Sequence, residues 1–295
     1  MPGKATAGAD DLVPFPEPVS DPTQAIGEDA DSHQKGQVRG SFEIGDAVAL
    51  VPDGKPAARE HLRHHAKPDY GEGFCIYNDN AFVAKYLIEK LRIERVLLLD
   101  TDAHQGNGTC EYFYNDPRVL FVDTHQDPTT LYPGSGFVND IGEGDGKGYT
   151  VNIPMPVYSG IDSYRMAFEQ IVEPLAREFK PQVIVRNGGS DPHFADGLTN
   201  LGLPIAGFRM IGDKMRQLTQ EVGCTEIDII GSGYNIEVLP SAWLAIVCGL
   251  LNLGVEVEEP VPVPSTFQQD AVADDTERVL QRLKGILKDY WKCFS

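Results

Sequence analysis

Residues Arg95–Gly108 read RVLLLDTDAHQGNG, an apolar run that ends abruptly in acidic residues, a histidine and glycines. A short run that is apolar on both faces is typical of a parallel strand covered by helices. In an extended chain residues i and i+2 point the same way. Asp102 and His104 can therefore face one point, and Asp100 joins them if the strand geometry persists. Three interpretations stay open: a solvated turn, helix-capping polarity, or a metal site at the end of a buried strand.

Four more apolar runs predict further strands, at residues 118–124, 149–155, 181–189 and 226–233. Between the runs, apolar residues recur at spacings of three and four, which predicts helices at residues 78–91, 162–179, 208–222 and 241–254. Strands that alternate with helices indicate parallel pairing through helical crossovers. The sequence therefore predicts an α/β fold, a single three-layer α/β/α domain with a mostly parallel central sheet.

Changes in composition divide the chain into four parts. Residues 1–41 are rich in Pro, Gly, Asp and Ala and lack periodicity, so we expect an irregular or disordered segment. Residues 42–255 carry the alternating pattern of the main domain, and residues 256–270 form a proline-rich connector. Residues 271–295 predict a C-terminal helix that docks on the domain through a stripe of Val279, Leu280, Leu283, Ile286, Leu287 and Tyr290.

The charge and cysteine content exclude several classes of protein. Net charge is −19, from 44 acidic and 25 basic side chains, which argues against direct nucleic-acid binding by phosphate neutralisation. The five cysteines form no C-x-x-C pair, so reduced thiols in a cytosolic compartment are expected. Neither a signal segment nor an apolar run long enough to span a membrane is apparent. We therefore expect a cytoplasmic protein with no membrane partner.

Polar clusters follow the other predicted strands as well. They are Asp123–His125, NGGSDPH at Asn187–His193 and GSGYN at Gly231–Asn235. Ligands bind at the shared carboxyl edge of parallel strands, so these clusters should converge there. Asp191 is the best candidate for a second carboxylate beside Asp102 and His104. Three protein ligands with a fourth position for water describe a catalytic zinc site. A buried hydrogen-bonded pair without metal remains the alternative.

The adjacent histidines His64 and His65 indicate acid–base chemistry. Two neutral imidazoles in one pocket cannot both become charged cheaply, so one can act as a base while the other stays or becomes cationic. Asp100 and Asn107 are available as orienting acceptors. Together with a metal-bound water and the phenol of Tyr234, such a base completes a hydrolytic site. Taken alone, the histidines could lie on the surface and the tyrosine could be packed in the core.

Five motifs in one order carry a resemblance to a known family: HHAKPDYGEGFCIYN, DTDAHQGNGT, LYPGSG, NGGSDPHFADGL and GSGYN. Their order and approximate spacing resemble the histone deacetylase superfamily, which includes acetoin-utilisation proteins, acetylpolyamine amidohydrolases and related bacterial and archaeal deacylases. The resemblance covers roughly Ala47–Gly254 and implies an arginase/deacetylase fold. Members usually have well over a hundred residues before the paired histidines, whereas 63 precede them here. We therefore expect a shortened N-terminal part and an open-mouthed site, which a neighbour in a homo-oligomer could complete.

The resemblance also implies the bound ions. One zinc or ferrous ion would be held by Asp102, His104 and Asp191. A structural K⁺ or Na⁺ would be held by Asp100, Asp102, His104, Asp123 and Thr124, through backbone carbonyls in the case of Asp102 and His104.

Catalytic roles follow from the same mapping. His65 would be the general base and acid, with Asn107 as its partner, and His64 its electrostatic neighbour, paired with Asp100. Tyr234 would polarise the amide carbonyl. The narrow channel for an acyl-lysine-like chain would be lined by Gly73, Phe74, Tyr132 and Leu198. Asn107 stands where many members have aspartate. An amide orients an imidazole without adding charge, so a weaker effect on the pKa of the base is expected.

The implied reaction is metal-dependent hydrolysis of an N-acyl amide, with an acylated lysine or a small acylated amine as substrate. A non-catalytic or weakly active binding protein is the alternative, because of the short N-terminal part. An acetylpolyamine amidohydrolase is less favoured, since Leu198 occupies the position of an acidic gatekeeper. A ureohydrolase is less favoured too, because Gly106 and His193 replace the carboxylates that a second metal needs.

Overall fold

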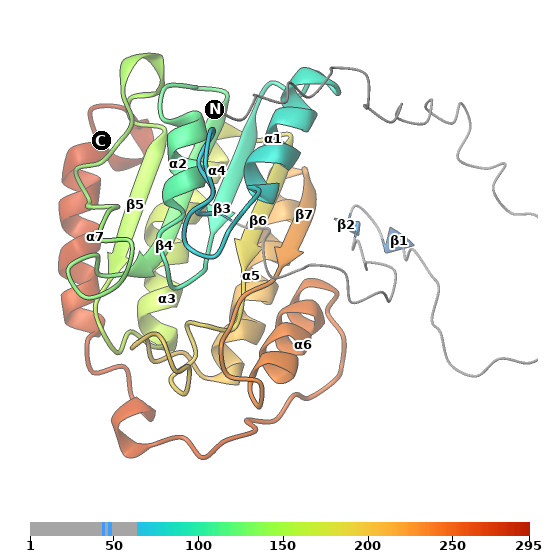
Figure 1. The fold of residues 1–295 in the computed structure, drawn as a ribbon, viewed down its shortest axis with the longest axis vertical. Coiled ribbons are helices and arrows are strands. Elements are labelled where there is room, and N and C mark those ends of the chain that lie inside the picture. Colours follow the sequence, from blue (N-terminus) through green and yellow to red (C-terminus); the bar gives the residue numbers. More distant parts are fainter. Residues whose placement is uncertain (1–42, 45–46, 49–63) are drawn as a thin grey trace, which may run out of the picture. The chain divides into compact units, whose positions relative to one another are not determined.

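The computed structural model describes residues 43–44, 47–48 and 64–295, and its core is a parallel sheet (Figure 1). Within these residues the main strands are β3 (Val96–Asp100), β4 (Val119–Gln126), β5 (Thr150–Met155), β6 (Val183–Gly188) and β7 (Thr225–Ile230). They pair in the order β7-β6-β3-β4-β5, and every neighbouring pair is parallel. Beyond β7 the order continues through two strands of two residues each, β2 (Ala47–Val48) and β1 (Glu43–Ile44).

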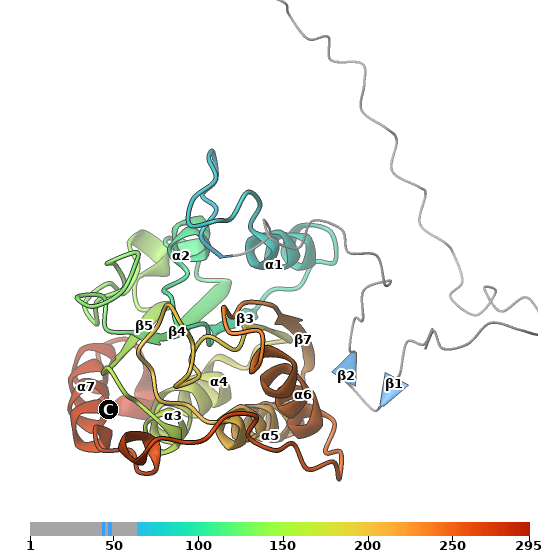
Figure 2. The same cartoon turned by 60° about the horizontal axis from the view of Figure 1, so that its bottom comes forward.

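Helices cover both faces of the sheet, as Figure 2 shows. One face packs against α1 (Asp79–Glu89) and α2 (Asn107–Phe113). The other packs against α3 (Ile161–Ala167), α4 (Glu173–Phe179), α5 (Ile205–Val222), α6 (Leu239–Leu250) and α7 (Ala273–Leu287). Alternation along β3 produces the two cores, because Leu97 and Leu99 join the second face while Val96 and Leu98 join the first. The predicted three-layer α/β/α fold is confirmed.

Three local features differ from the expected elements. The predicted helix at residues 162–179 consists of α3 and α4 joined by a π-helical turn, η4 (Phe168–Val172). The short helix α2 was not predicted at all. In α7, Leu280, Leu283 and Leu287 are fully buried, but Tyr290 is 41% exposed. Because α7 ends at Leu287, the buried aromatic residue is Trp291, whose Nε1 donates to the carbonyl of Gly148 at 2.8 Å. The expectation of an irregular segment at residues 1–41 lies outside the described residues.

No helix in the described ranges is both long and apolar enough to pass through a bilayer.

A buried arginine links three strands beneath the carboxyl edge of the sheet. Arg186 on β6 is 0% exposed, and its guanidinium donates to both carboxylate oxygens of Asp228 on β7, at 2.5 and 3.1 Å. A third donor, Nη1, reaches the hydroxyl of Thr101, directly after β3, at 2.8 Å. Removing one partner of a buried pair leaves the other charge uncompensated.

Arg186→Met is therefore expected to lower the free energy of unfolding by about 3–5 kcal/mol. Urea denaturation followed by circular dichroism measures this. The matched control is Arg177→Met, because Arg177 pairs with Glu173 and Glu221 at the surface. That change should cost less than about 1 kcal/mol. Equal losses in the two variants would show that burial of the Arg186 pair is not what stabilises the strands.

Candidate metal centre and catalytic site

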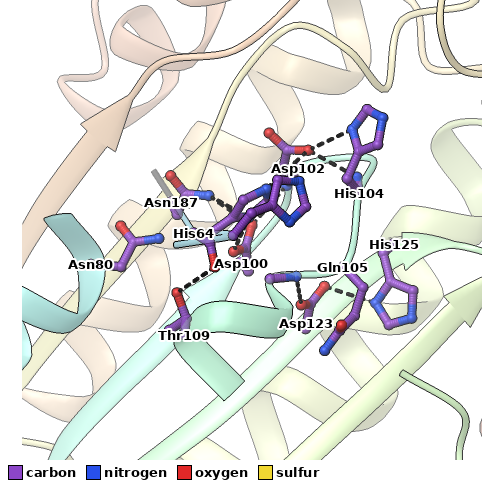
Figure 3. Close-up of polar contacts among 12 residues, drawn as sticks. His64, Asn80, Asp100, Asp102, His104, Gln105, Thr109, Asp123, His125 and Asn187 are labelled. Carbon is purple, nitrogen blue, oxygen red and sulfur yellow. Dashed lines mark hydrogen bonds and ion pairs between the residues drawn. The ribbon is translucent and has the colours of Figure 1, made fainter. Parts of the chain in front are cut away.

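The register of the sheet places polar residues side by side at its carboxyl edge. Asp100 ends β3, where it is level with Asp123 of β4 and Asn187 of β6. Asn187 Nδ2 donates to Asp100 Oδ1 at 2.9 Å, and both side chains are buried (Figure 3). The clusters that follow separate strands therefore meet at one edge, as the sequence predicts.

Asp102, His104 and Asp191 form the candidate metal centre. One ligand atom from each lies within 4.8 Å of the others, and all three residues are buried. His104 Nδ1 is 3.1 Å from Asp102 Oδ1 and 3.1 Å from Asp191 Oδ2. The backbone N–H of His104 donates to Asp102 Oδ1 at 2.8 Å, which holds the loop after β3 in a tight turn. Asp191 Oδ1 accepts a hydrogen bond from Ser232 Oγ at 3.1 Å.

The charges at this centre fit a divalent cation. Burial and the neighbouring Asp102 charge raise the pKa of Asp191 to about 7. Burial also raises the pKa of Asp102, but His64 and His104 outweigh that effect and hold it well below its usual range. Two buried carboxylates that repel each other beside an imidazole nitrogen are a donor set suited to zinc or ferrous iron. The residues present therefore fit the metal that the sequence resemblance implies.

The two adjacent histidines have different hydrogen-bond partners, and their pKa values shift in opposite directions. His64 Nδ1 lies 2.8 Å from Asp100 Oδ2, and His65 Nδ1 lies 2.7 Å from Asn107 Oδ1. Burial lowers the pKa of His64, but Asp100 and Asp102 outweigh it and raise the pKa to about 9. Burial and the charge of His64 lower the pKa of His65 to about 3. The arrangement keeps His64 cationic and His65 neutral.

The rings of Tyr234 and His65 both pack edge-on near the ring of His104, a member of the candidate metal centre. The ring centroid of His104 is 6.0 Å from that of His65 and 6.1 Å from that of Tyr234. Tyr234 is 44% exposed, and its backbone N–H donates to Asp196 Oδ2 at 2.8 Å. Ser232, two residues before Tyr234, has a φ of 111°, a backbone region that side chains rarely adopt. Since Ser232 also donates to Asp191, this strained turn links the phenol to the metal centre.

Two of the four predicted channel residues, Gly73 and Tyr132, contact His65 directly. A Cβ atom on Gly73 would lie 2.5 Å from the ring of His65, so the bare backbone at Gly73 packs on the imidazole. Tyr132 places its ring edge-on to His65, with centroids 5.1 Å apart. Phe74 and Leu198 are 78% and 50% exposed, as expected for residues at a rim.

The residues predicted to hold a monovalent cation are also buried together. Thr124 Oγ1 donates to the carbonyl of Asp100 at 3.3 Å. Asp123 accepts the backbone N–H of Gly106 at 2.8 Å through Oδ2, while its Oδ1 lies 2.8 Å from His125 Nδ1. Burial and the charge of Asp100 act to raise the pKa of Asp123. A monovalent cation at this place stays a prediction.

Residues 30–250 match the family model described as "Histone deacetylase domain". The chain belongs to the histone deacetylase family. A probable deacetylase of Archaeoglobus fulgidus is 39% identical over 238 residues, which are 79% of this chain and 66% of that protein. An acetoin utilization protein AcuC of Staphylococcus aureus is 36% identical over 229 residues, 76% of this chain and 58% of that protein.

Solved structures of the family share the fold. The HD domain of HDA15 superposes with a TM-score of 0.66 at 27% identity, covering 78% of this chain and 60% of that one. The histone deacetylase Clr3 gives a TM-score of 0.63 at 29% identity, covering 74% of this chain and 36% of that one. The chain thus spans between 40% and 66% of the length of the first curated relatives it matches.

Sequence reasoning missed several residues that support the deacetylase-like site. Asn187 and Ser232 both lie in the polar clusters that follow the strands, but the sequence pattern predicts no role for them. Asp196, which holds the backbone at Tyr234, and Glu72, which accepts a hydrogen bond from the hydroxyl of Tyr132 at 3.0 Å, received no role either. All four contacts cross between strands or loops, so only the register of the sheet and the loop paths bring the partners together.

Proposed function

We propose that this chain hydrolyses N-acyl amides, releasing an acetyl or related acyl group from a lysine-like amine. The observation that carries this proposal is the position of His104. Its ring packs edge-on near both His65 and Tyr234, and its Nδ1 lies 3.1 Å from each of two buried carboxylates. A metal-ligand set, a base and a hydrogen-bond donor around one point are the parts that amide hydrolysis requires. Membership of the histone deacetylase family supports the same reaction.

Asp102, His104 and Asp191 would hold one zinc or ferrous ion. Bound there, the ion supplies Lewis acidity, which polarises the acyl carbonyl and makes a water molecule more acidic.

The proton transfers fall to His65. Asn107 Oδ1 can only accept a hydrogen bond, so His65 Nδ1 carries the hydrogen and Nε2 has the free lone pair. Nε2 takes the proton from the attacking water and then gives it to the departing amine. His64 assists without touching the substrate, because its positive charge disfavours protonation of His65 before water attacks. Asp100 balances that charge.

Tyr234 supplies the hydrogen-bond donor of the proposed site. Its hydroxyl donates to the acyl oxygen as negative charge develops there. The backbone at Tyr234 is held by Asp196 and, through Ser232, by the metal ligand Asp191. The phenol is therefore positioned by the same network that positions the metal donors.

Asp191→Ala is expected to abolish stoichiometric metal binding, because it removes one of the two carboxylates. Titration of the metal-free chain with Co²⁺, followed by absorption spectroscopy, measures the affinity without reference to activity. Ser232→Ala should weaken binding by about 10–100-fold, since it removes only a hydrogen bond to a ligand. Asp162→Ala is the matched control, because it removes a carboxylate that pairs with Arg165 at the surface, and it should bind the ion normally. Full Co²⁺ binding by Asp191→Ala would contradict the assigned ligand set.

The function itself is tested with a panel of acyl-lysine peptides of increasing acyl length on the zinc- and iron-loaded chain. Hydrolysis of at least one acyl group, lost in Asp191→Ala, supports the proposal. A chain that binds one metal ion yet hydrolyses no acyl length would instead be a deacetylase-like binding protein.

A further inference from the structure

Glu72 is held in a fixed position beside the base His65. It begins a tight turn that Cys75 closes, with backbone hydrogen bonds of 3.0 Å from Glu72 N–H and 2.8 Å from Cys75 N–H. The two central residues, Gly73 and Phe74, have φ values of 55° and 64°, the positive values of the tightest hairpin turns. This turn lays the backbone of Gly73 against the ring of His65. Glu72 therefore starts from a rigid backbone next to the catalytic centre.

Tyr132 holds the carboxylate of Glu72 through a hydrogen bond. Its hydroxyl donates to Glu72 Oε1 at 3.0 Å while its ring packs edge-on to His65. The loop that carries Tyr132 is itself anchored, because the carbonyl of Gly136 accepts a hydrogen bond from His125 Nε2 at 2.9 Å. Glu72 thus cannot turn away from the rim without breaking a contact that also positions the channel wall.

The carboxylate lies near exposed side chains that carry no charge. Phe74, Tyr132 and Leu198, the exposed residues predicted to line the channel, carry no charge. The nearby cation Lys67 forms its ion pair with Glu111 at 2.5 Å. Among the described residues, Glu72 Oε2 has no side-chain partner. A carboxylate with a free oxygen attracts a positively charged group on any molecule that enters the channel.

We propose that Glu72 is a specificity-determining residue, which binds a cationic group flanking the acylated amine. This rests on the proposed function, since it assumes that an acyl-lysine chain enters past Gly73 and Tyr132. The substrate class is then an acyl-lysine peptide with a guanidinium or ammonium group next to the modified residue. Tyr132 is a positioning residue, because its hydroxyl holds the carboxylate toward the entering chain. The net charge of −19 favours approach by the same class of peptide.

The test compares two peptides that differ only in charge, one with arginine and one with citrulline beside acetyl-lysine. Binding to the zinc-loaded chain is measured by fluorescence anisotropy, and hydrolysis is measured separately. The arginine peptide should bind about 1.5- to fivefold more tightly, the range of an exposed ion pair. In Glu72→Gln the ratio of the two affinities should fall to about 1. The arginine peptide should bind more weakly, and the affinity for the citrulline peptide should stay the same. In Tyr132→Phe the ratio should fall part of the way, because the charge remains but is no longer held.

The matched control is Asp69→Asn, which removes the same charge from the same loop away from Tyr132 and should keep the wild-type ratio. If Glu72→Gln keeps the affinity ratio as well, or weakens the binding of both peptides equally, Glu72 does not bind the flanking cationic group. A charge-dependent ratio without hydrolysis would retain this inference and overturn the proposed function. Hydrolysis of both peptides with no charge preference would support the proposed function and overturn this inference. Failure of the wild-type chain to bind either peptide would reject both.

Discussion

His65→Ala is expected to lower kcat by about 10³–10⁴-fold while the bound metal stays at the wild-type level. The change removes the group that moves the proton from water to the leaving amine, and such transfers contribute up to about 10⁴-fold. Metal content should be unaffected, because the ligand atoms belong to Asp102, His104 and Asp191. Single-turnover hydrolysis of an acetyl-lysine peptide, combined with metal analysis of the same sample, measures both quantities. A rate within tenfold of wild type would assign the proton transfer to another group.

Asn107→Asp provides a conservative companion to that variant. A carboxylate at this position favours the protonated imidazole, so it raises the pKa of His65 from its low value of about 3. The neutral form of His65 is then lost at a higher pH than in wild type. The acid limb of the kcat/KM profile should therefore shift to higher pH. His64 remains cationic up to about pH 9, so it does not contribute to that limb. An unchanged profile would show that His65 does not set the acid limb.

The sequence was sufficient for the layers of the fold because each strand is apolar on both faces. The runs at β3, β4 and β6 are fully buried, and burial on both sides leaves an unbroken apolar pattern. The seven-residue helix α2 escaped notice because glycine and asparagine at its start have low helix propensity. The π-turn between α3 and α4 was missed for a different reason. A π-helical turn has one extra residue, which hardly changes the spacing of apolar residues at intervals of three and four.

Some contacts of the candidate site could be predicted from local sequence spacing, and others depend on the fold. Asp102 and His104 could be paired from sequence, since residues two apart in an extended segment share a direction. Asn187 beside Asp100 depends on the alignment of β6 with β3, and Ser232 beside Asp191 depends on a strained turn. Neither is encoded in local spacing. The opposite pKa shifts of His64 and His65 likewise depend on which ring contacts Asp100 and which contacts Asn107.

Tyr234→Phe should lower kcat by about 10²–10³-fold, the effect of losing one donor to a developing oxyanion. Phenylalanine keeps the ring that packs edge-on near His104, so the metal centre and the shape of the rim are retained. The readout is kcat and KM for an acetyl-lysine peptide, with Co²⁺ affinity as a check on the metal centre. Tyr158→Phe makes the same change at a tyrosine of similar exposure and should leave the kinetics as they are.

The division of the effect between kcat and KM decides what the hydroxyl does. A donor that acts on the oxyanion strengthens its bond as charge develops, so its loss lowers kcat and leaves KM nearly constant. A hydroxyl that only contacts the bound substrate would raise KM with kcat unchanged. A ketone analogue of the substrate, whose hydrate resembles the tetrahedral state, should lose affinity in Tyr234→Phe in proportion to kcat. If the ketone bound the variant as tightly as wild type while kcat fell, Tyr234 would have to act in a step other than stabilisation of that state.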